Sequence, residues 1–322
     1  MNISLRPIDL DADVARLVEI FNSVGPEPTT IEQQYERRNT ADPGEIKQEL
    51  VAVDADGVIV GASYIGRSPW VQPGRFWTGL IVAPEARSEG VGTALFTAVE
   101  SWAAVQQATR LTGQVRDHEP AWLQWAERRG FRMDRHIFES SLPLGDFDAA
   151  PFAGVVERVA AGGIRFFTLA DTAHDEAAQR RFYELHSATM ADVPGFDLPP
   201  KPFAQFQREY FGASWYRPDI QVVAAADDEW VGVGAMGYFP HNNNMYHMMT
   251  GVRPAFRGRQ IALAIKLLTL EAARRYSVGY VRTNNDAHNA PMLTINRKMG
   301  YVPQPGKYQV VREMQGDDAP QV

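Results

Sequence analysis

The sequence predicts an α/β (α+β) protein made of two tandem domains, each with a mixed, mostly antiparallel sheet flanked by helices. Three observations carry this prediction. A chain of 322 residues is long enough for two domains of ordinary size. The second half repeats the first, and each half begins with strands and continues as strand–helix–strand–helix. The expected domains cover residues 1–145 and 157–314, with a linker that contains Pro and Gly over residues 142–156.

The repeat emerges when the chain is compared with itself at an offset of 170 positions, without gaps. Residues 82–87 then fall on residues 252–257, and Gly130-Phe131 falls on Gly300-Tyr301. Chance similarity between two amphipathic helices would not keep a Pro, an Arg and a distant Gly-aromatic pair in one register. We therefore interpret the chain as a duplication. The apolar stripe of the shared helix, with the spacing of one buried face, superimposes as well: Val91, Leu95, Ala98 and Trp102 on Ile261, Ile265, Leu268 and Ala272.

Each half is predicted to contain the same elements in the same order. Turns rich in Asp and Gly separate the hairpin strands, and a Gly follows the last helix. The polar end over 315–322 is expected to fray. The predicted elements are an opening strand (Ile3–Ile8; Ile164–Leu169), a helix (Asp13–Val24; Asp175–Met190), two hairpin strands (Leu50–Asp54 and Val58–Ile65; Gln221–Ala225 and Trp230–Tyr238), a strand ending at Val82 or Val252, the amphipathic helix, a strand (Leu111–Val115; Tyr280–Thr283) and a second helix ending at Gly130 or Gly300.

Composition excludes several classes of function. The absence of cysteine excludes disulfides, thiolate metal sites and a cysteine nucleophile. A formal net charge of −7 disfavours non-specific binding to nucleic acid or to an anionic membrane. The chain has no run near the ~20 apolar residues that cross a bilayer, and its acidic start does not resemble a secretory signal. We expect a cytoplasmic protein with no metal and no nucleic-acid or membrane partner; the oligomeric state is open.

The segment from Val252 to Ala262 is predicted to bind an anion. A strand ends at Val252, Pro254 fixes the exit, and a helix begins near Ile261. The first amides of a helix lack partners and lie at the positive end of its dipole. Three arginines and no carboxylate lie between these ends, which suits a pyrophosphate.

The residues Arg257, Gly258, Arg259, Gln260, Ile261 and Ala262 resemble the Arg-x-x-Gly-x-Gly/Ala acetyl-CoA signature of the GNAT superfamily of N-acetyltransferases. The region from Thr283 to Leu293, followed by Gly300-Tyr301, is similar to the family's downstream motif, in which an Asn, here Asn289, contacts the cofactor. Two copies in one chain resemble the tandem members, such as mycothiol synthase. The resemblance implies a V-shaped opening between the fourth and fifth strands. There the amine of an acceptor, expected to be a small molecule, would attack acetyl-CoA directly, through a tetrahedral intermediate.

The two halves differ at this motif. Glu85 and Glu89 flank the motif arginine of the first half, and Glu119 stands where the second half has Asn289. In the second half Gln260 replaces the first glycine. Because charge repulsion outweighs a side chain at a helix start, we expect the C-terminal domain to be catalytic and the N-terminal domain to be degenerate or regulatory. The N-terminal copy still contains the residues of a cofactor site: Val82, Arg87, Gly90 and Gly92.

The catalytic groups depart from the family pattern. Many family members have a Tyr that protonates the departing thiolate; the matching positions here are Ala126 and Asn296, and Asn296 could donate a hydrogen bond to sulfur. Tyr246 and His247 are the candidates for the base, although lining of the pocket or core is an alternative for each. His118 and His288 coincide in the repeat and are interpreted as helix caps.

Two further features leave alternatives open. The loop over 190–202 lies where the family has its acceptor-binding lid; its Asp192 could hold an ammonium group or be an ordinary turn carboxylate. Residues 232–237 match G-x-G-x-x-G, but no helix start follows, so we interpret them as a strand rather than a dinucleotide site. The alternative to an N-acetyltransferase is a non-catalytic acetyl-CoA sensor or scaffold.

Overall fold

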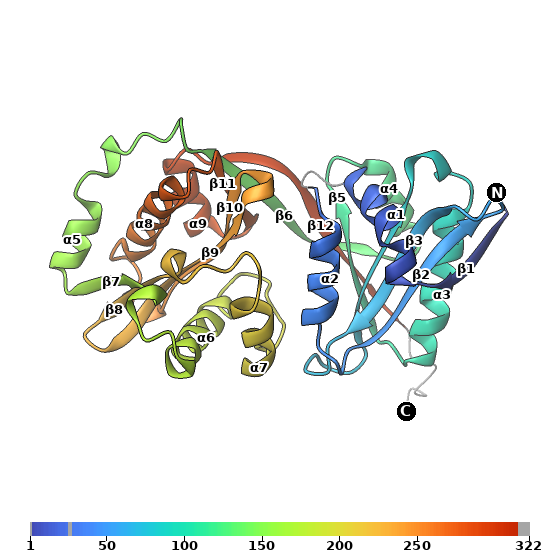
Figure 1. Ribbon diagram of the computed structural model, residues 1–322, viewed down its shortest axis with the longest axis horizontal. Coiled ribbons are helices and arrows are strands. Elements are labelled where there is room, and N and C mark those ends of the chain that lie inside the picture. Colours follow the sequence, from blue (N-terminus) through green and yellow to red (C-terminus); the bar gives the residue numbers. More distant parts are fainter. Residues whose placement is uncertain (1, 25–27, 315–322) are drawn as a thin grey trace, which may run out of the picture. The chain divides into compact units, whose positions relative to one another are not determined.

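The chain forms two units, each built on a mixed sheet with helices on both faces (Figure 1). The computed structural model describes residues 2–24 and 28–314. In both units the strands are antiparallel to their neighbours except at one place, where the fourth and fifth strands of the repeat are parallel. This is the predicted α/β architecture, and it occurs twice, as the repeat predicts.

The first unit contains the residues up to Asp134 and the chain from Lys307 onward. Its strands follow the order β1-β2-β3-β4-β5-β12. The elements are β1 (Ile3–Pro7), α1 (Leu10–Asn22), α2 (Ile31–Thr40), β2 (Ile46–Asp54), β3 (Ile59–Arg67), β4 (Arg75–Val82), α3 (Val91–Val105), β5 (Arg110–Arg116), α4 (Pro120–Glu127) and the second part of β12 (Val302–Glu313).

The second unit contains Arg135–Gly306, and its strands follow the order β6-β11-β10-β9-β8-β7. The elements are β6 (Arg132–Pro143), α5 (Val155–Ala161), β7 (Ile164–Thr168), α6 (Glu176–Met190), α7 (Phe203–Phe206), β8 (Val222–Ala226), β9 (Glu229–Phe239), β10 (Asn244–Val252), α8 (Ile261–Arg275), β11 (Tyr280–Asp286) and α9 (Ala290–Lys298). Gln207–Phe211 continues α7 as a short π-helical turn.

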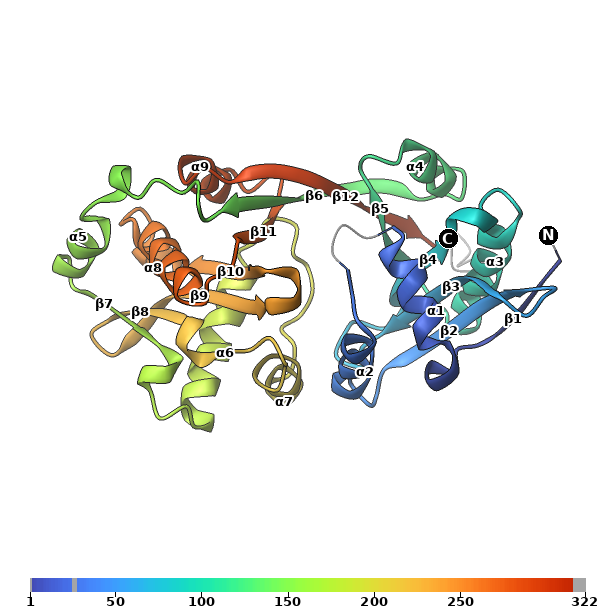
Figure 2. The same ribbon diagram turned by 45° about the horizontal axis from the view of Figure 1, so that its top comes forward.

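The last strand of each repeat lies in the sheet of the other unit. β6 follows the Gly-Phe pair of the first repeat and pairs antiparallel with β11, from Ile137 to Pro143 (Figure 2). β12 follows the Gly-Tyr pair of the second repeat and pairs antiparallel with β5, from Lys307 to Glu313. The compact units therefore differ from the sequence ranges 1–145 and 157–314, because these ranges follow the repeats along the chain.

Separate apolar clusters cover the two faces of the second sheet. One cluster joins β10 and β11 to α8, α9 and α5, with Ile261 and Ile265 of the predicted stripe fully buried. The other joins β8, β9 and β10 to α6, α7 and the π-helical turn, around the buried Phe182 and Leu185. In the first unit α3 and α1 likewise pack on different clusters. One face of β10 thus packs against α8, and the other packs against α6.

Several connections differ from the expectation. The predicted linker over 142–156 contains the end of β6 and the start of α5, so only the stretch between Pro143 and Val155 is a connection. The helices α2, α5 and α7 and the strands β6 and β12 were not predicted. The C-terminal residues expected to fray, 315–322, lie outside the described residues. In the part of the chain that the structure describes, no helix is long and apolar enough to cross a membrane.

Candidate active site

The parallel strands separate in each unit. β10 and β11 pair from Asn244 with Tyr280 to His247 with Thr283, and then no further, although β10 continues to Val252 and β11 to Asp286. In the first unit β4 and β5 pair only as far as Trp77 with Thr112. In both copies the fourth and fifth strands therefore separate beyond these pairs, and their facing edges no longer form a ladder with each other.

Of the two described fourth strands, β10 carries a bulge beside its opening and β4 does not. Its pairing with β9 shifts register between His247 and Met249, which makes Met248 an extra residue. The pairing of β3 with β4 shows no such shift from Gly61 with Val82 to Gly66 with Trp77. A bulge leaves an amide outside the ladder and re-aims the neighbouring side chains, and bulges are enriched next to active sites. The offset between the repeats shows the same insertion. Tyr280 and Arg110 are 170 positions apart, but their strand partners Asn244 and Arg75 are 169 positions apart. Since the ends of the two fourth strands are again 170 positions apart, β10 contains one residue more than β4.

The turn into the long helix has the same unusual backbone in both units. Two residues are left-handed in each copy: Ser88 and Gly90 before α3, and Gly258 and Gln260 before α8, with φ between 61° and 88°. Successive amides in such alternating conformations form a concavity that binds anions, and here it opens at a helix N-terminus. The geometry fits the predicted pyrophosphate loop of Val252, Arg257, Gly258, Arg259, Gln260, Ile261 and Ala262, and that of Val82, Arg87, Gly90 and Gly92.

The charges around the two loops are more alike than the sequence suggests. In the second unit Arg257 pairs with Asp192, and Arg253 lies 3.5 Å from Glu229. Arg259 donates to the carbonyl of Gly162 at 2.7 Å. In the first unit Arg16 pairs with Glu85, so that carboxylate is neutralised. When these partners are counted, the loop before α8 and the loop before α3 differ less in charge. That difference was the reason for choosing the C-terminal domain as the catalytic one.

The two motif arginines have different surroundings. In each copy Nε donates to the carbonyl at the end of the fourth strand, Arg257 to Val252 at 3.0 Å and Arg87 to Val82 at 3.4 Å. The guanidinium of Arg87 lies over the ring of Trp122, 5.2 Å from its centroid, whereas that of Arg257 reaches a carboxylate. Both side chains therefore bond the loop to the end of the fourth strand, but Arg87 contacts an aromatic ring and Arg257 contacts a carboxylate.

The downstream motif contains a buried chain of amides. Asn289 caps α9 by accepting from the Met292 amide at 3.3 Å, which leaves its amide hydrogens available to a ligand. Asn296 is buried and donates to Asn285 at 2.6 Å, and Asn285 donates to the Ser140 hydroxyl on β6 at 2.8 Å. One amide hydrogen of Asn296 is used in this chain, so the other can serve a ligand.

Tyr246 and His247 lie on opposite faces of β10, as neighbours on a strand do. Nδ1 of the buried His247 is 3.4 Å from Nζ of Lys266 on α8, and Nε2 is 2.9 Å from the Thr250 hydroxyl. Burial, followed by the Lys266 charge, lowers the pKa of His247 well below its ordinary 6.5. Burial alone lowers the pKa of Lys266 to about 7. Lys266 was missed because it stands within the apolar run of α8; that position was its only signal.

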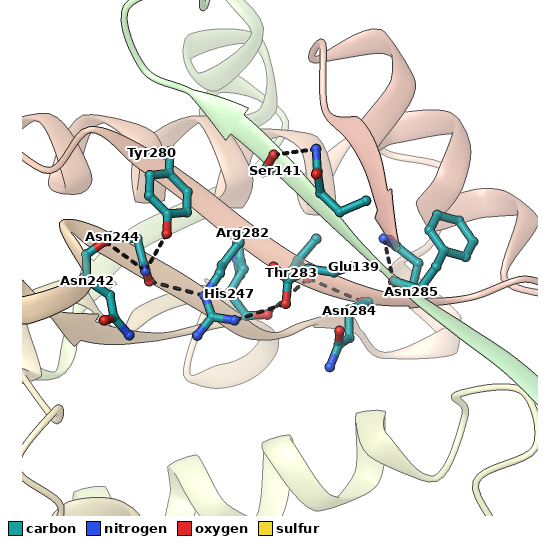
Figure 3. A network of polar contacts seen from close by, with 12 residues as sticks. Glu139, Ser141, Asn242, Asn244, His247, Tyr280, Arg282, Thr283, Asn284 and Asn285 are labelled. Atoms are coloured by element: carbon teal, nitrogen blue, oxygen red, sulfur yellow. Dashed lines mark hydrogen bonds and ion pairs between the residues drawn. The ribbon is translucent and has the colours of Figure 1, made fainter. Parts of the chain in front are cut away.

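Tyr246 belongs to a polar row that crosses three strands. Burial raises the pKa of its hydroxyl to about 12. The guanidinium of Arg282 on β11 lies 5.0 Å from the Tyr246 ring centroid and donates to Glu139 on β6 at 2.9 Å. Figure 3 shows Arg282 between Glu139 and Asn244, with Thr283 donating to the carbonyl of His247. At neutral pH Tyr246 is therefore a hydrogen-bond donor.

The structure corrects the interpretation of His288. The cap of α9 is Asn289, and in the first unit Glu119 occupies the N-cap of α4, so neither His288 nor His118 caps the following helix. Nδ1 of His288 instead lies 3.2 Å from the buried carboxylate of Asp286. Burial opposes ionisation of Asp286, but the His288 amide and the Arg135 guanidinium outweigh it and lower its pKa below the ordinary value.

Two other expectations concern sites elsewhere in the chain. Residues 232–237 lie inside β9 with no helix start after them, which confirms that they are a strand. Asp192, which could hold an ammonium group, is paired with Arg257. Among residues 2–24 and 28–314, no group of three or more acidic or histidine side chains is placed to hold a metal ion.

Comparison with known proteins agrees with this geometry. Residues 14–131 match the model of the acetyltransferase (GNAT) family. A tandem GNAT protein from the clavulanic acid biosynthesis pathway superposes with a TM-score of 0.78 at 21% identity, covering 98% of this chain and 100% of its own. A GCN5-related N-acetyltransferase from Sphaerobacter thermophilus gives a TM-score of 0.70 at 19% identity, covering 97% and 95%. No curated protein sequence matches the chain.

The match in sequence covers the first repeat, and the match in fold covers nearly the whole chain. The sequence match and the fold match both agree with the repeat, with the two openings and with the two helix-start loops. Residues 14–131 thus match the acetyltransferase (GNAT) family, and the chain as a whole has the fold of a tandem GNAT protein.

Proposed function

We propose that the protein transfers an acetyl group from acetyl-CoA to the amine of a small molecule, in the opening between β10 and β11. The observation that carries this proposal is the combination of a bulge, a separated strand pair and a left-handed helix-start loop in the second unit. Among the residues that the structure describes, the second unit combines all three and the first does not. This favours the C-terminal domain as the catalytic one, although the two loops differ less in charge than the sequence suggests.

The cofactor would lie along these features in order. The amides from Gly258 to Ala262 and the guanidinium of Arg257 would hold the pyrophosphate. Asn289 would donate to the cofactor where α9 begins. The pantetheine arm would pair with the free edge of β10 between Met249 and Val252. The first unit has a similar loop at Val82, Arg87, Gly90 and Gly92, for which we propose a binding or regulatory role.

The chemistry would be a direct attack. The amine nitrogen bonds to the thioester carbon, the tetrahedral intermediate collapses, and the carbon–sulfur bond breaks to give amide and CoA. The amide that the bulge at Met248 leaves outside the ladder is suited to stabilise the developing oxyanion. The second amide hydrogen of Asn296 would stabilise the sulfur as it leaves.

Proton transfer would involve the residues on the two faces of β10. Tyr246 stays protonated at neutral pH and would orient the amine or the oxyanion as a donor. His247 is neutral at that pH and would accept the amine's proton through the Thr250 hydroxyl. Since a charged His247 is disfavoured, Lys266, with a pKa of about 7, is placed to take up the proton next. The thiolate is protonated at the end of the cycle.

Acetyl-CoA turnover over a panel of small amines, with released CoA detected as a free thiol, tests the proposal. The absence of cysteine removes background from protein thiols. Amine-dependent CoA release with one acetamide formed per CoA is the expected result. Binding of acetyl-CoA without release in the presence of any amine would instead favour the sensor or scaffold function. A variant lacking Met248 tests whether turnover needs the bulge.

A further inference from the structure

The exchanged strand β6 carries an arginine directly to the opening of the second unit. The side chain of Arg135 is 15% exposed, and its partner carboxylate on Asp286 at the end of β11 is 3% exposed. Nε lies 2.8 Å and Nη2 lies 2.7 Å from the same carboxylate oxygen. The guanidinium of a residue encoded in the first repeat is thus fixed beside the strand that forms one wall of the opening in the second.

The same guanidinium holds the loop between α6 and α7. Nη1 donates to the carbonyl of Gly195 at 2.6 Å, and Nη2 donates to the carbonyl of Pro194 at 2.8 Å. Gly195 has a φ of +69°, and a Cβ built on it would lie 2.7 Å from Nε of Arg135. Loop and arginine are therefore fitted at a distance that only glycine allows.

The loop is attached on the other side of the opening as well. Asp192, three residues before Gly195, pairs with Arg257, which follows the end of β10. One short segment is therefore tied to the chain after β10 through its carboxylate and to β6 and β11 through its carbonyls. Because β10 and β11 separate beyond His247 and Thr283, the segment from Asp192 to Gly195 links the chain after β10 to the end of β11, the two strands that form the opening.

We propose that Arg135 is a positioning residue that holds the loop over 190–202 in the conformation that receives the acceptor. The inference rests on the proposed function of the opening, and it adds that the first repeat contributes a residue to the acceptor side of the second. The planar guanidinium of Arg135 donates to one carboxylate and to two backbone carbonyls at once. A lysine ammonium cannot make these three contacts in one plane, which explains why the residue is an arginine.

Two substitutions separate this role from simple stabilisation. Arg135→Lys keeps a cation near Asp286 but loses the fork to the carbonyls, whereas Arg135→Met loses both. The matched control is Arg312→Met on the other exchanged strand, where Arg312 pairs with Glu100 at 2.6 Å in the first unit. For Arg135→Lys we expect a KM for the amine raised about 10-fold, the size of one lost charge-assisted hydrogen bond, with affinity for acetyl-CoA within about twofold of the parent.

Hydrogen exchange gives a second readout that needs no activity. The amides of residues 195–198 should exchange faster in Arg135→Lys and Arg135→Met than in the parent. Their exchange rates should be unchanged in Arg312→Met. The parent protein without any ligand is the reference. This measurement stays informative if no amine is ever acetylated, in which case the proposed function fails while the positioning role is still tested.

The outcomes divide cleanly. Faster exchange in the loop together with a selective rise in the amine KM supports the proposal. Parent-like loop exchange in Arg135→Lys overturns it, and so does an equal loss of affinity for amine and acetyl-CoA. If Arg135→Met does not fold, Arg135→Lys still decides, since it retains the charge that faces Asp286.

Discussion

Nζ of Lys266 on α8 lies 3.4 Å from Nδ1 of His247 on β10, and both side chains are buried. The ring centroid of Tyr301 lies 4.6 Å from the same Nζ. Burial is the cause that lowers the pKa of Lys266 to about 7, from an ordinary value of 10.5. A buried amine with these neighbours reduces the stability of the fold, and this effect depends on pH.

We predict that Lys266→Met stabilises the protein at pH 7. Because the pKa of Lys266 is lower in the folded chain, the unfolded chain binds one more proton between about pH 7 and 10.5. The free energy of unfolding therefore rises with pH across this window and falls as pH is lowered through it. The advantage of the variant should shrink by about 1.4 kcal/mol per pH unit on raising the pH. Urea unfolding at pH 7 and 9 measures it.

The matched control is Lys298→Met at the end of α9, a lysine whose side chain is exposed. It should show the same pH dependence of stability as the parent. A Lys266→Met protein that is less stable than the parent at pH 7, by an amount independent of pH, would contradict the prediction. If Lys266 also accepts the proton from His247, the variant will be more stable and less active.

The left-handed positions before α3 and α8 provide a second prediction. Each copy has one glycine and one non-glycine residue there: Ser88 with Gly90, and Gly258 with Gln260. A non-glycine residue in this region is strained, while glycine has a larger entropy in the unfolded chain. We expect Gln260→Gly to raise the free energy of unfolding by roughly 0.5–1 kcal/mol.

The reciprocal change should have the opposite sign. A Cβ built on Gly258 meets no atom within 4 Å, so Gly258→Ala tests backbone strain without a clash. It should lower the free energy of unfolding by about 1 kcal/mol. Thermal melts of both variants, without cofactor, measure the two effects. Equal effects of one sign would show that backbone conformation does not control stability at this turn.

Local patterns account for much of what the sequence predicted. The stripe of Ile261 and Ile265 and the turn residues at Gly130 and Gly300 mark helices that the structure contains. Such signals depend on neighbours in the chain, so they can be recognised without knowing the fold. The resemblance to the GNAT family supplied the loop at 257–262, a position that periodicity alone does not assign to a cofactor.

What was missed depends on contacts between distant residues. That β6 joins β11 follows from pairs such as Arg135 with Asp286 and Arg282 with Glu139, more than 140 positions apart. The bulge at Met248 is visible only in the register with β9. The same applies to Arg16, which neutralises Glu85 from another element and weakens an argument based on local charge. Each of these features can be recognised only once the positions of residues distant in the sequence are known.

The two motif arginines test which copy binds the cofactor. We expect Arg257→Ala to weaken acetyl-CoA binding about 10-fold or more, the size of a lost charge-assisted hydrogen bond, and Arg87→Ala by less than about 3-fold. The reason is that Arg257 faces a carboxylate that a pyrophosphate can replace, whereas Arg87 lies over Trp122. Calorimetric titration with acetyl-CoA measures both affinities.

Asp192 provides the control for this comparison. Asp192→Asn frees Arg257 from its carboxylate partner and should strengthen acetyl-CoA binding, most clearly at low salt. Equal losses in Arg257→Ala and Arg87→Ala would defeat the choice of the C-terminal copy. A weaker affinity in Asp192→Asn would show that the ion pair itself builds the site.

The last prediction separates the roles of Tyr246 and His247. With a pKa of about 12, the Tyr246 hydroxyl stays protonated, so Tyr246→Phe should remove one hydrogen bond and lower kcat/KM by no more than about 10-fold. His247→Gln removes the proposed proton acceptor and should lower kcat by about 100-fold or more. Thr250→Val keeps the shape of the strand but breaks the 2.9 Å contact to His247, so it should resemble His247→Gln in kcat. Activity on an amine that is already unprotonated at neutral pH should be affected least by His247→Gln, because such an acceptor gives up its proton later in the reaction. A larger loss of kcat in Tyr246→Phe than in His247→Gln would reverse the assignment and place the essential group on the α6 face of β10.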